Sequence, residues 1–136
     1  MPDIITADGV PAWLIKHIQD ARSLFGVGGS EWHVYVVMVN EPGGCSELNG
    51  FCKVDAVYLN ADLEFKSDLS DDDIGRNAAY HEVLHIVHQE VDQVAFMALN
   101  RLGKKQRKIL KQVYREAVER FIQRMSRSIT ANVREQ

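Results

Sequence analysis

Apolar residues recur at the interval of one helix face between Pro11 and Phe25, and this pattern predicts an amphipathic helix. Proline suits the first turn of a helix, because the N–H that it lacks has no partner there in any case. The glycine-rich run from Gly26 to Gly29 predicts the end of the helix. The apolar face comprises Trp13, Leu14, Ile18, Ala21 and Phe25.

Two later stretches have the composition of β-strands. Residues 31–40 (Glu31–Asn40) are rich in valine and aromatic residues, and they end at the turn signal Glu41-Pro42-Gly43-Gly44. Residues 51–59 (Phe51–Leu59) predict a second strand. We expect the acidic segment that follows, residues 60–69, to be a connection.

Two long helices are predicted in the second half of the chain. Ser70 and the three aspartates after it mark a helix start, with a capping side chain and negative charge at the positive end of the dipole. This helix should span residues 71–102, because Gly103 breaks it. A second helix should run from Lys104 to Ile129, with frayed residues after Thr130. Its apolar stripe comprises Leu110, Val113, Tyr114, Ala117, Phe121 and Met125.

The predicted order of helix, two strands and two long helices indicates the α+β class, in one domain that spans residues 1–136. No stretch approaches the roughly 18 consecutive apolar residues of a membrane span. The N-terminus lacks the basic start and apolar run of a signal peptide, so we expect a cytoplasmic protein without a membrane partner. In that compartment Cys45 and Cys52 should be free thiols.

Charge is unevenly distributed along the chain. Residues 1–100 carry 16 acidic and 5 basic side chains, whereas residues 101–136 carry 11 basic and 3 acidic ones. We expect the basic helix to lie on an acidic body. A nucleic-acid partner is the less favoured interpretation, because no aromatic residues are interleaved with the basic ones for stacking on bases.

The pattern His-Glu-x-x-His at residues 81–85 indicates a metal site. At about 100° per residue, His81 and His85 lie about 40° apart on one helix face, so both imidazoles can converge on one tetrahedral Zn²⁺. Glu82 lies about 100° from His81, where its carboxylate can take a proton from a zinc-activated water. The motif predicts Zn²⁺ as cofactor, with His81 and His85 as ligands and Glu82 as general base.

This pattern resembles that of the zincin metallopeptidases, and more closely the minimal, gluzincin-like members and small phage-encoded H-E-x-x-H proteins. In such proteins a small sheet precedes the motif helix, and a second helix supplies a glutamate ligand. Here the similar order of elements runs from about Glu31 to Ile129, and Asp55–Asn60 looks like the edge strand that lines the cleft. Neither the distal Gly and His of the metzincins nor an N-E-x-x-x-D sequence follows His85. The third ligand is therefore not fixed by a motif.

Four residues are candidates for the third ligand. His88 and Asp92 share the histidine face, but His88 lies roughly 10 Å along the axis from His81. If the two long helices pair antiparallel about Gly103, Glu119 faces Val87 near the height of His85, and Glu116 faces Glu90. We therefore favour Glu119 over Glu116, His88 and Asp92.

Three further residues, Asn77, Tyr80 and Tyr114, are candidates for donors to a developing oxyanion or for partners of the ligands. We assign no role to His17 or His33. The resemblance implies a zinc-dependent metallopeptidase that hydrolyses a peptide or protein substrate. The alternative is a non-enzymatic, zincin-derived regulatory module with a structural metal, but such a site has no use for a carboxylate at Glu82.

Overall fold

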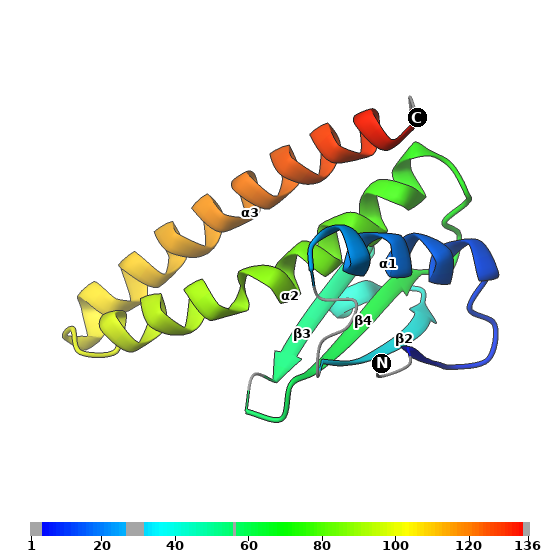
Figure 1. Ribbon diagram of the computed structural model, residues 1–136. Coiled ribbons are helices and arrows are strands. Elements are labelled where there is room, and N and C mark those ends of the chain that lie inside the picture. Colours follow the sequence, from blue (N-terminus) through cyan, green and yellow to red (C-terminus); the bar gives the residue numbers. More distant parts are fainter. Residues whose placement is uncertain (1–3, 27–31, 56, 135–136) are drawn as a thin grey trace.

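Three helices and four strands make up the residues that the computed structural model describes, which are 4–26, 32–55 and 57–134. The α+β class predicted from the sequence is confirmed. Two of the strands were not predicted (Figure 1). In chain order the elements are β1 (Ile4–Thr6), α1 (Ala12–Leu24), β2 (His33–Val39), the 3-10 turn η1 (Pro42–Gly44), β3 (Gly50–Asp55), β4 (Asn60–Lys66), α2 (Asp73–Leu99) and α3 (Lys104–Arg134).

The sheet is mixed, with the strand order β1-β2-β4-β3. β1 pairs parallel with β2, β2 pairs parallel with β4, and β3 runs antiparallel to β4 at the edge. The prediction of a connection over residues 60–69 is wrong, because β4 lies inside the sheet. Its apolar residues Ala61, Leu63 and Phe65 are fully buried, while Asp62 and Glu64 alternate with them on the other face.

The second predicted strand is shorter than expected and the proposed edge strand is misplaced. β3 ends at Asp55, whose carboxylate accepts hydrogen bonds from the N–H groups of Val57 and Tyr58 at 3.1 and 3.3 Å. This side chain stabilises a turn where residues 51–59 were expected to continue as a strand. The edge strand is therefore Gly50–Asp55 rather than Asp55–Asn60.

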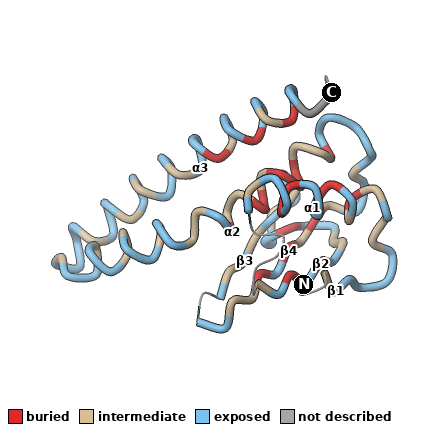
Figure 2. Tube along the Cα trace, in the orientation of Figure 1, coloured by how far each residue is buried: buried red, intermediate tan, exposed pale blue. Residues whose placement is uncertain are grey.

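Both α1 and α2 pack on one face of the sheet, and the core lies between these two layers (Figure 2). α1 begins after Pro11 and ends at Leu24, within a residue of the prediction at each end. The rest of the predicted glycine-rich stop, residues 27–29, lies outside the described residues, as does Glu31 at the start of the first predicted strand. Gly75 lets Trp13 of α1 approach the first turn of α2, since a Cβ there would lie 2.9 Å from the indole and 2.1 Å from the Ser70 carbonyl oxygen.

The two long helices form where the sequence predicts them, but their ends differ. Asp72, rather than Ser70, caps α2 by accepting a hydrogen bond from the Gly75 N–H at 2.9 Å. α2 ends at Leu99, three residues before the predicted end. α3 continues to Arg134, so the fraying expected after Thr130 is wrong; Thr130 itself is buried.

The helices α2 and α3 form an antiparallel hairpin whose far end projects away from the sheet (Figure 1). The predicted apolar stripe of α3 is largely exposed, with Leu110, Val113 and Phe121 each open to solvent by 43% to 54%. The helix instead buries Ile122, Ser126 and Thr130. The basic helix therefore packs chiefly on α2, and not broadly on the acidic body as expected.

Two further expectations concern the whole chain. Among the described residues, no helix is both long and apolar enough to cross a membrane. Cys45 and Cys52 are free cysteines, as predicted.

Candidate metal centre

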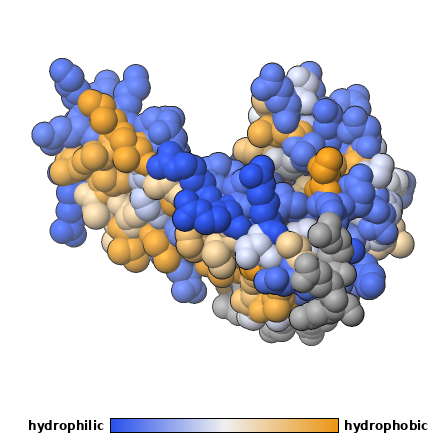
Figure 3. All heavy atoms as spheres, turned by 90° about the horizontal axis from the view of Figure 1, so that it is seen from above, coloured by the Kyte–Doolittle hydropathy of each residue, from blue (hydrophilic) through white to orange (hydrophobic). Residues whose placement is uncertain are grey.

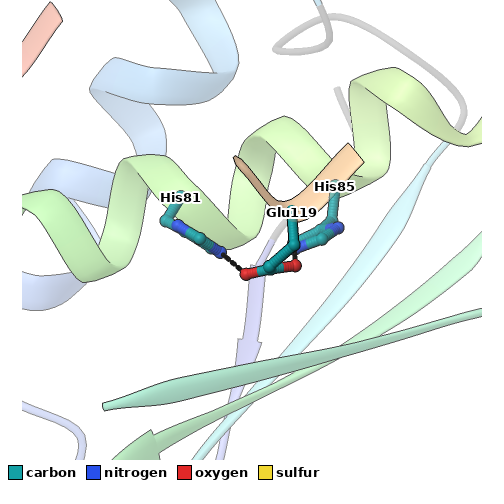
Figure 4. A group of neighbouring side chains, drawn as sticks. All are labelled: His81, His85 and Glu119. Atoms are coloured by element: carbon teal, nitrogen blue, oxygen red, sulfur yellow. Dashed lines mark hydrogen bonds and ion pairs between the residues drawn. The ribbon is translucent and has the colours of Figure 1, made fainter. Parts of the chain in front are cut away.

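Two histidines of α2 and one glutamate of α3 converge beside the edge strand (Figure 4). His81 Nε2 lies 2.7 Å from Glu119 Oε1, and His85 Nε2 lies 3.1 Å from Glu119 Oε2. The two imidazole rings are 5.1 Å apart between centroids. We call His81, His85 and Glu119 the cleft cluster.

The donor atoms of the cleft cluster suit a zinc ion in type and in spacing. Two imidazole nitrogens and one carboxylate are a common ligand set for zinc sites that keep a position open. Ligand atoms about 2.1 Å from a tetrahedral ion are roughly 3.4 Å apart. The three donors lie within 4.8 Å of one another, so changes of up to about 1.4 Å in their separations bring them to this spacing.

Glu82 lies at the bottom of the same site and is 5% exposed. Burial raises the pKa of its carboxyl from 4.5 to about 7, although the nearby His81 and His85 act in the opposite direction. Gly50 of β3 makes room for this side chain, because a Cβ at that position would lie 3.0 Å from both Cγ and Oε2 of Glu82. The edge strand and the buried carboxyl are therefore in direct contact.

The carboxylate of Glu119 is held ionised by the two histidines. Its hydrogen bonds to His81 and His85 lower its pKa well below the ordinary range. At His81, burial disfavours the charged imidazolium, but the hydrogen bond to Glu119 and the charges of Glu82 and Glu119 outweigh it and raise the pKa. Negative charge is thus concentrated where a cation would be bound.

Gln123, one turn beyond Glu119, holds His81 from its other side. In the orientation of the amide that satisfies both neighbours, its nitrogen donates to His81 Nδ1 at 2.6 Å and its oxygen accepts from Arg127 at 2.9 Å. A His81 that binds a metal through Nε2 needs the opposite orientation, in which the Gln123 oxygen accepts from Nδ1–H at 2.6 Å. Sequence reasoning missed this residue, although its position four residues after Glu119 places both on one helix face.

A cavity of about 500 Å³ opens onto the cluster and defines the cleft. One wall is β3 with the loop before it, including Leu48, Gly50 and Cys52. The opposite wall is formed by α2 and α3. Asn77 also lines this cavity, and its buried Oδ1 has no hydrogen-bond partner among the described residues.

The other candidate residues lie outside the cleft. His88 and Asp92 are bonded to each other at 2.9 Å, and the Tyr114 hydroxyl donates to the same Asp92 oxygen at 2.7 Å. We call these three residues the hairpin cluster. Glu116 is exposed and accepts from Gln112 on its own helix. Tyr80 is buried in the core against Phe25.

Of the predicted residues, the structure therefore brings His81, Glu82, His85 and Glu119 together, with Asn77 at the cavity wall. Comparison of the chain with protein-family models, with characterised proteins and with solved structures gives no match.

Proposed function

We propose that this protein is a zinc-dependent peptidase in which His81, His85 and Glu119 hold the metal and Glu82 transfers the proton. One observation carries the proposal. Three ligand-type side chains converge at the wall of a cavity, next to a buried carboxyl whose pKa lies near neutrality. A metal with only a structural role needs neither the cavity nor the buried carboxyl.

When bound, zinc supplies positive charge that acidifies a water molecule and polarises a carbonyl group. Glu82 then serves as the acceptor of the water proton and returns it to the leaving amine. Burial holds the pKa of this carboxyl at about 7, and a cation bound beside it would lower that pKa and favour the carboxylate that accepts the proton. Asn77 offers a polar group at the cavity wall for a substrate amide or carbonyl.

The sheet supports an extended peptide as the substrate. β3 pairs with β4 on one side only, and among the described residues no further strand covers its outer edge. A peptide can add to such an edge through main-chain hydrogen bonds. An edge strand beside a long H-E-x-x-H helix, with a glutamate from a second helix, is the arrangement expected of a zincin-like protein. The free thiols fit the proposed cytoplasmic location.

The decisive variant is Glu82→Gln, which keeps the shape of the side chain but cannot accept a proton at neutral pH. Peptide cleavage should fall by roughly 10²–10⁴-fold, while zinc content stays at the wild-type level. The measurement is cleavage of a mixed peptide library by the zinc-loaded protein, read by mass spectrometry. Glu90→Gln is the matched control, since Glu90 is an exposed glutamate on the same helix.

Two outcomes would contradict the proposal. Cleavage by Glu82→Gln at the wild-type rate removes Glu82 from the mechanism. A zinc-loaded wild type that cleaves no library peptide supports the alternative, a zinc-binding regulatory module without catalytic activity.

A further inference from the structure

The projecting end of the α2–α3 hairpin carries a group of exposed apolar side chains that no described residue covers (Figure 3). The six that define this hairpin face are exposed by 37% to 70%, and they are Val87, Val91, Val94, Leu110, Val113 and Phe121. Such side chains in a monomer leave a large apolar area in water, which is uncommon in proteins that function alone.

The six residues lie on one side of the hairpin. At about 100° per residue, Val87, Val91 and Val94 form a stripe about 60° wide on α2. Leu110, Val113 and Phe121 form a similar stripe on α3. Each stripe is turned by roughly 90–120° from the line along which the helices touch, and the antiparallel pairing brings both stripes to the same side. The hairpin is therefore apolar on one face and lacks a partner there.

We infer that this face is the interface of a homodimer, in which two hairpins pack face to face as a four-helix bundle. The exposed area supports a second copy of the chain as the occupant. With Met97, Ile109 and Met125 along its edges, the face comprises nine large side chains that are about half exposed. At roughly 60–120 Å² of apolar surface for each whole side chain, they present on the order of 400 Å². A stable interface needs roughly 800 Å² from each partner, of which somewhat more than half is apolar.

This interface leaves the cleft open. Glu82, which lines the cleft, lies about 150° around α2 from the centre of the apolar stripe. Dimerisation is thus independent of metal binding and of the proposed activity, and each can fail without the other.

The test is the mass of the full chain over a concentration series, measured by light scattering and sedimentation velocity. We expect the wild type to be a dimer with either zinc or chelator present. Val94→Lys places a charge in the interface twice, once from each copy, and should raise the dissociation constant by on the order of 100-fold or more. Gln93→Lys is the matched control. It adds the same charge to the neighbouring exposed position, about 130° from the apolar stripe, and should leave the dimer intact.

Circular dichroism and zinc binding establish whether each variant is folded. If Val94→Lys does not fold, the milder Val94→Ser replaces it, with an expected rise of about tenfold. A wild type that is monomeric at high concentration, or that only associates with a different protein, would overturn the homodimer itself. So would a dimer that Val94→Lys leaves unchanged.

Discussion

The cleft cluster and the hairpin cluster lie on successive turns of the same face of α2, and both combine histidine with a carboxylate from the hairpin. In the cleft cluster, two imidazole nitrogens point at one carboxylate from the other helix, beside a cavity. In the hairpin cluster, a single oxygen of Asp92 takes hydrogen bonds from both His88 and Tyr114. The residue types are similar, but only the first set has its donor atoms directed at one point.

The difference teaches that residue type and helix face are insufficient to define a metal site. Asp92 is 15% exposed, and its contacts tie the two helices together in the interior of the hairpin. Glu119 is 56% exposed and reaches into an open cavity, so it can move to accommodate an ion. A site for chemistry needs this access, whereas a polar contact within a helical hairpin does not.

The difference between the two clusters is tested most directly by removing one carboxylate from each of them. Glu119→Ala should weaken zinc binding by roughly 10³-fold, since the site loses one of three ligands. Asp92→Ala should leave zinc affinity within about threefold of the wild type, because Asp92 does not reach the metal position. Competition with a chromophoric chelator gives both affinities. Glu116→Ala is a further control on α3, and a loss there equal to that of Glu119→Ala would show that the ligand is misassigned.

A second prediction concerns the stability of the metal-free protein. The folded-state pKa of Glu82 lies above its ordinary value of 4.5, at about 7. Such a group lowers the free energy of unfolding of the protein as the pH rises from 4.5 through 7, because the folded state then has to hold a buried charge. Glu82→Gln removes this loss, so it should be more stable than the wild type by about 2–3 kcal/mol at pH 8 and by nearly nothing at pH 4.

Urea unfolding in the presence of a chelator, at both pH values, measures this difference. The hairpin cluster offers the contrast, since substitution of Tyr114 should give no comparable gain at pH 8. A stability difference between Glu82→Gln and wild type that is the same at both pH values would contradict the assignment.

The smallest expected effect is at the hairpin cluster itself. Tyr114→Phe removes the hydroxyl that donates to Asp92, while His88 still satisfies the same oxygen. We expect a loss of about 1 kcal/mol in unfolding free energy, with zinc affinity unchanged. Thermal unfolding with and without zinc measures the unfolding free energy and the zinc affinity separately. A large loss of zinc affinity would show that the hairpin cluster contributes to metal binding.

The parts of the molecule that depend on local pattern could be predicted from the sequence. α1, α2 and the start of α3 follow from apolar spacing, capping residues and Gly103. Antiparallel pairing of α2 and α3 about Gly103 predicted the placement of Glu119. The same pairing places Asp92 opposite Tyr114, and these two residues are in contact. Whether Glu119 is a metal ligand stays a prediction.

The parts that depend on tertiary contacts could not be predicted. The acidic residues Asp62 and Glu64 made the segment of β4 look like a polar connection, although its residues alternate between buried and accessible. The three residues of β1 are too few to give a pattern. The contact of Gly50 with Glu82 has no signal in the sequence. The stripe of α3 was identified correctly as apolar, but such a pattern does not say whether its partner lies in the same chain.

The contacts of Glu119 with the two histidines join α2 to α3 through protein groups alone. The three polar groups satisfy one another across a separation of 38 residues between His81 and Glu119, and this contact closes the hairpin. Small zinc domains such as zinc fingers are instead unfolded until the ion arrives. If this cluster binds zinc as we propose, the ion would replace an existing cross-link rather than create one. Removal of zinc should then leave a folded chain that can be reloaded.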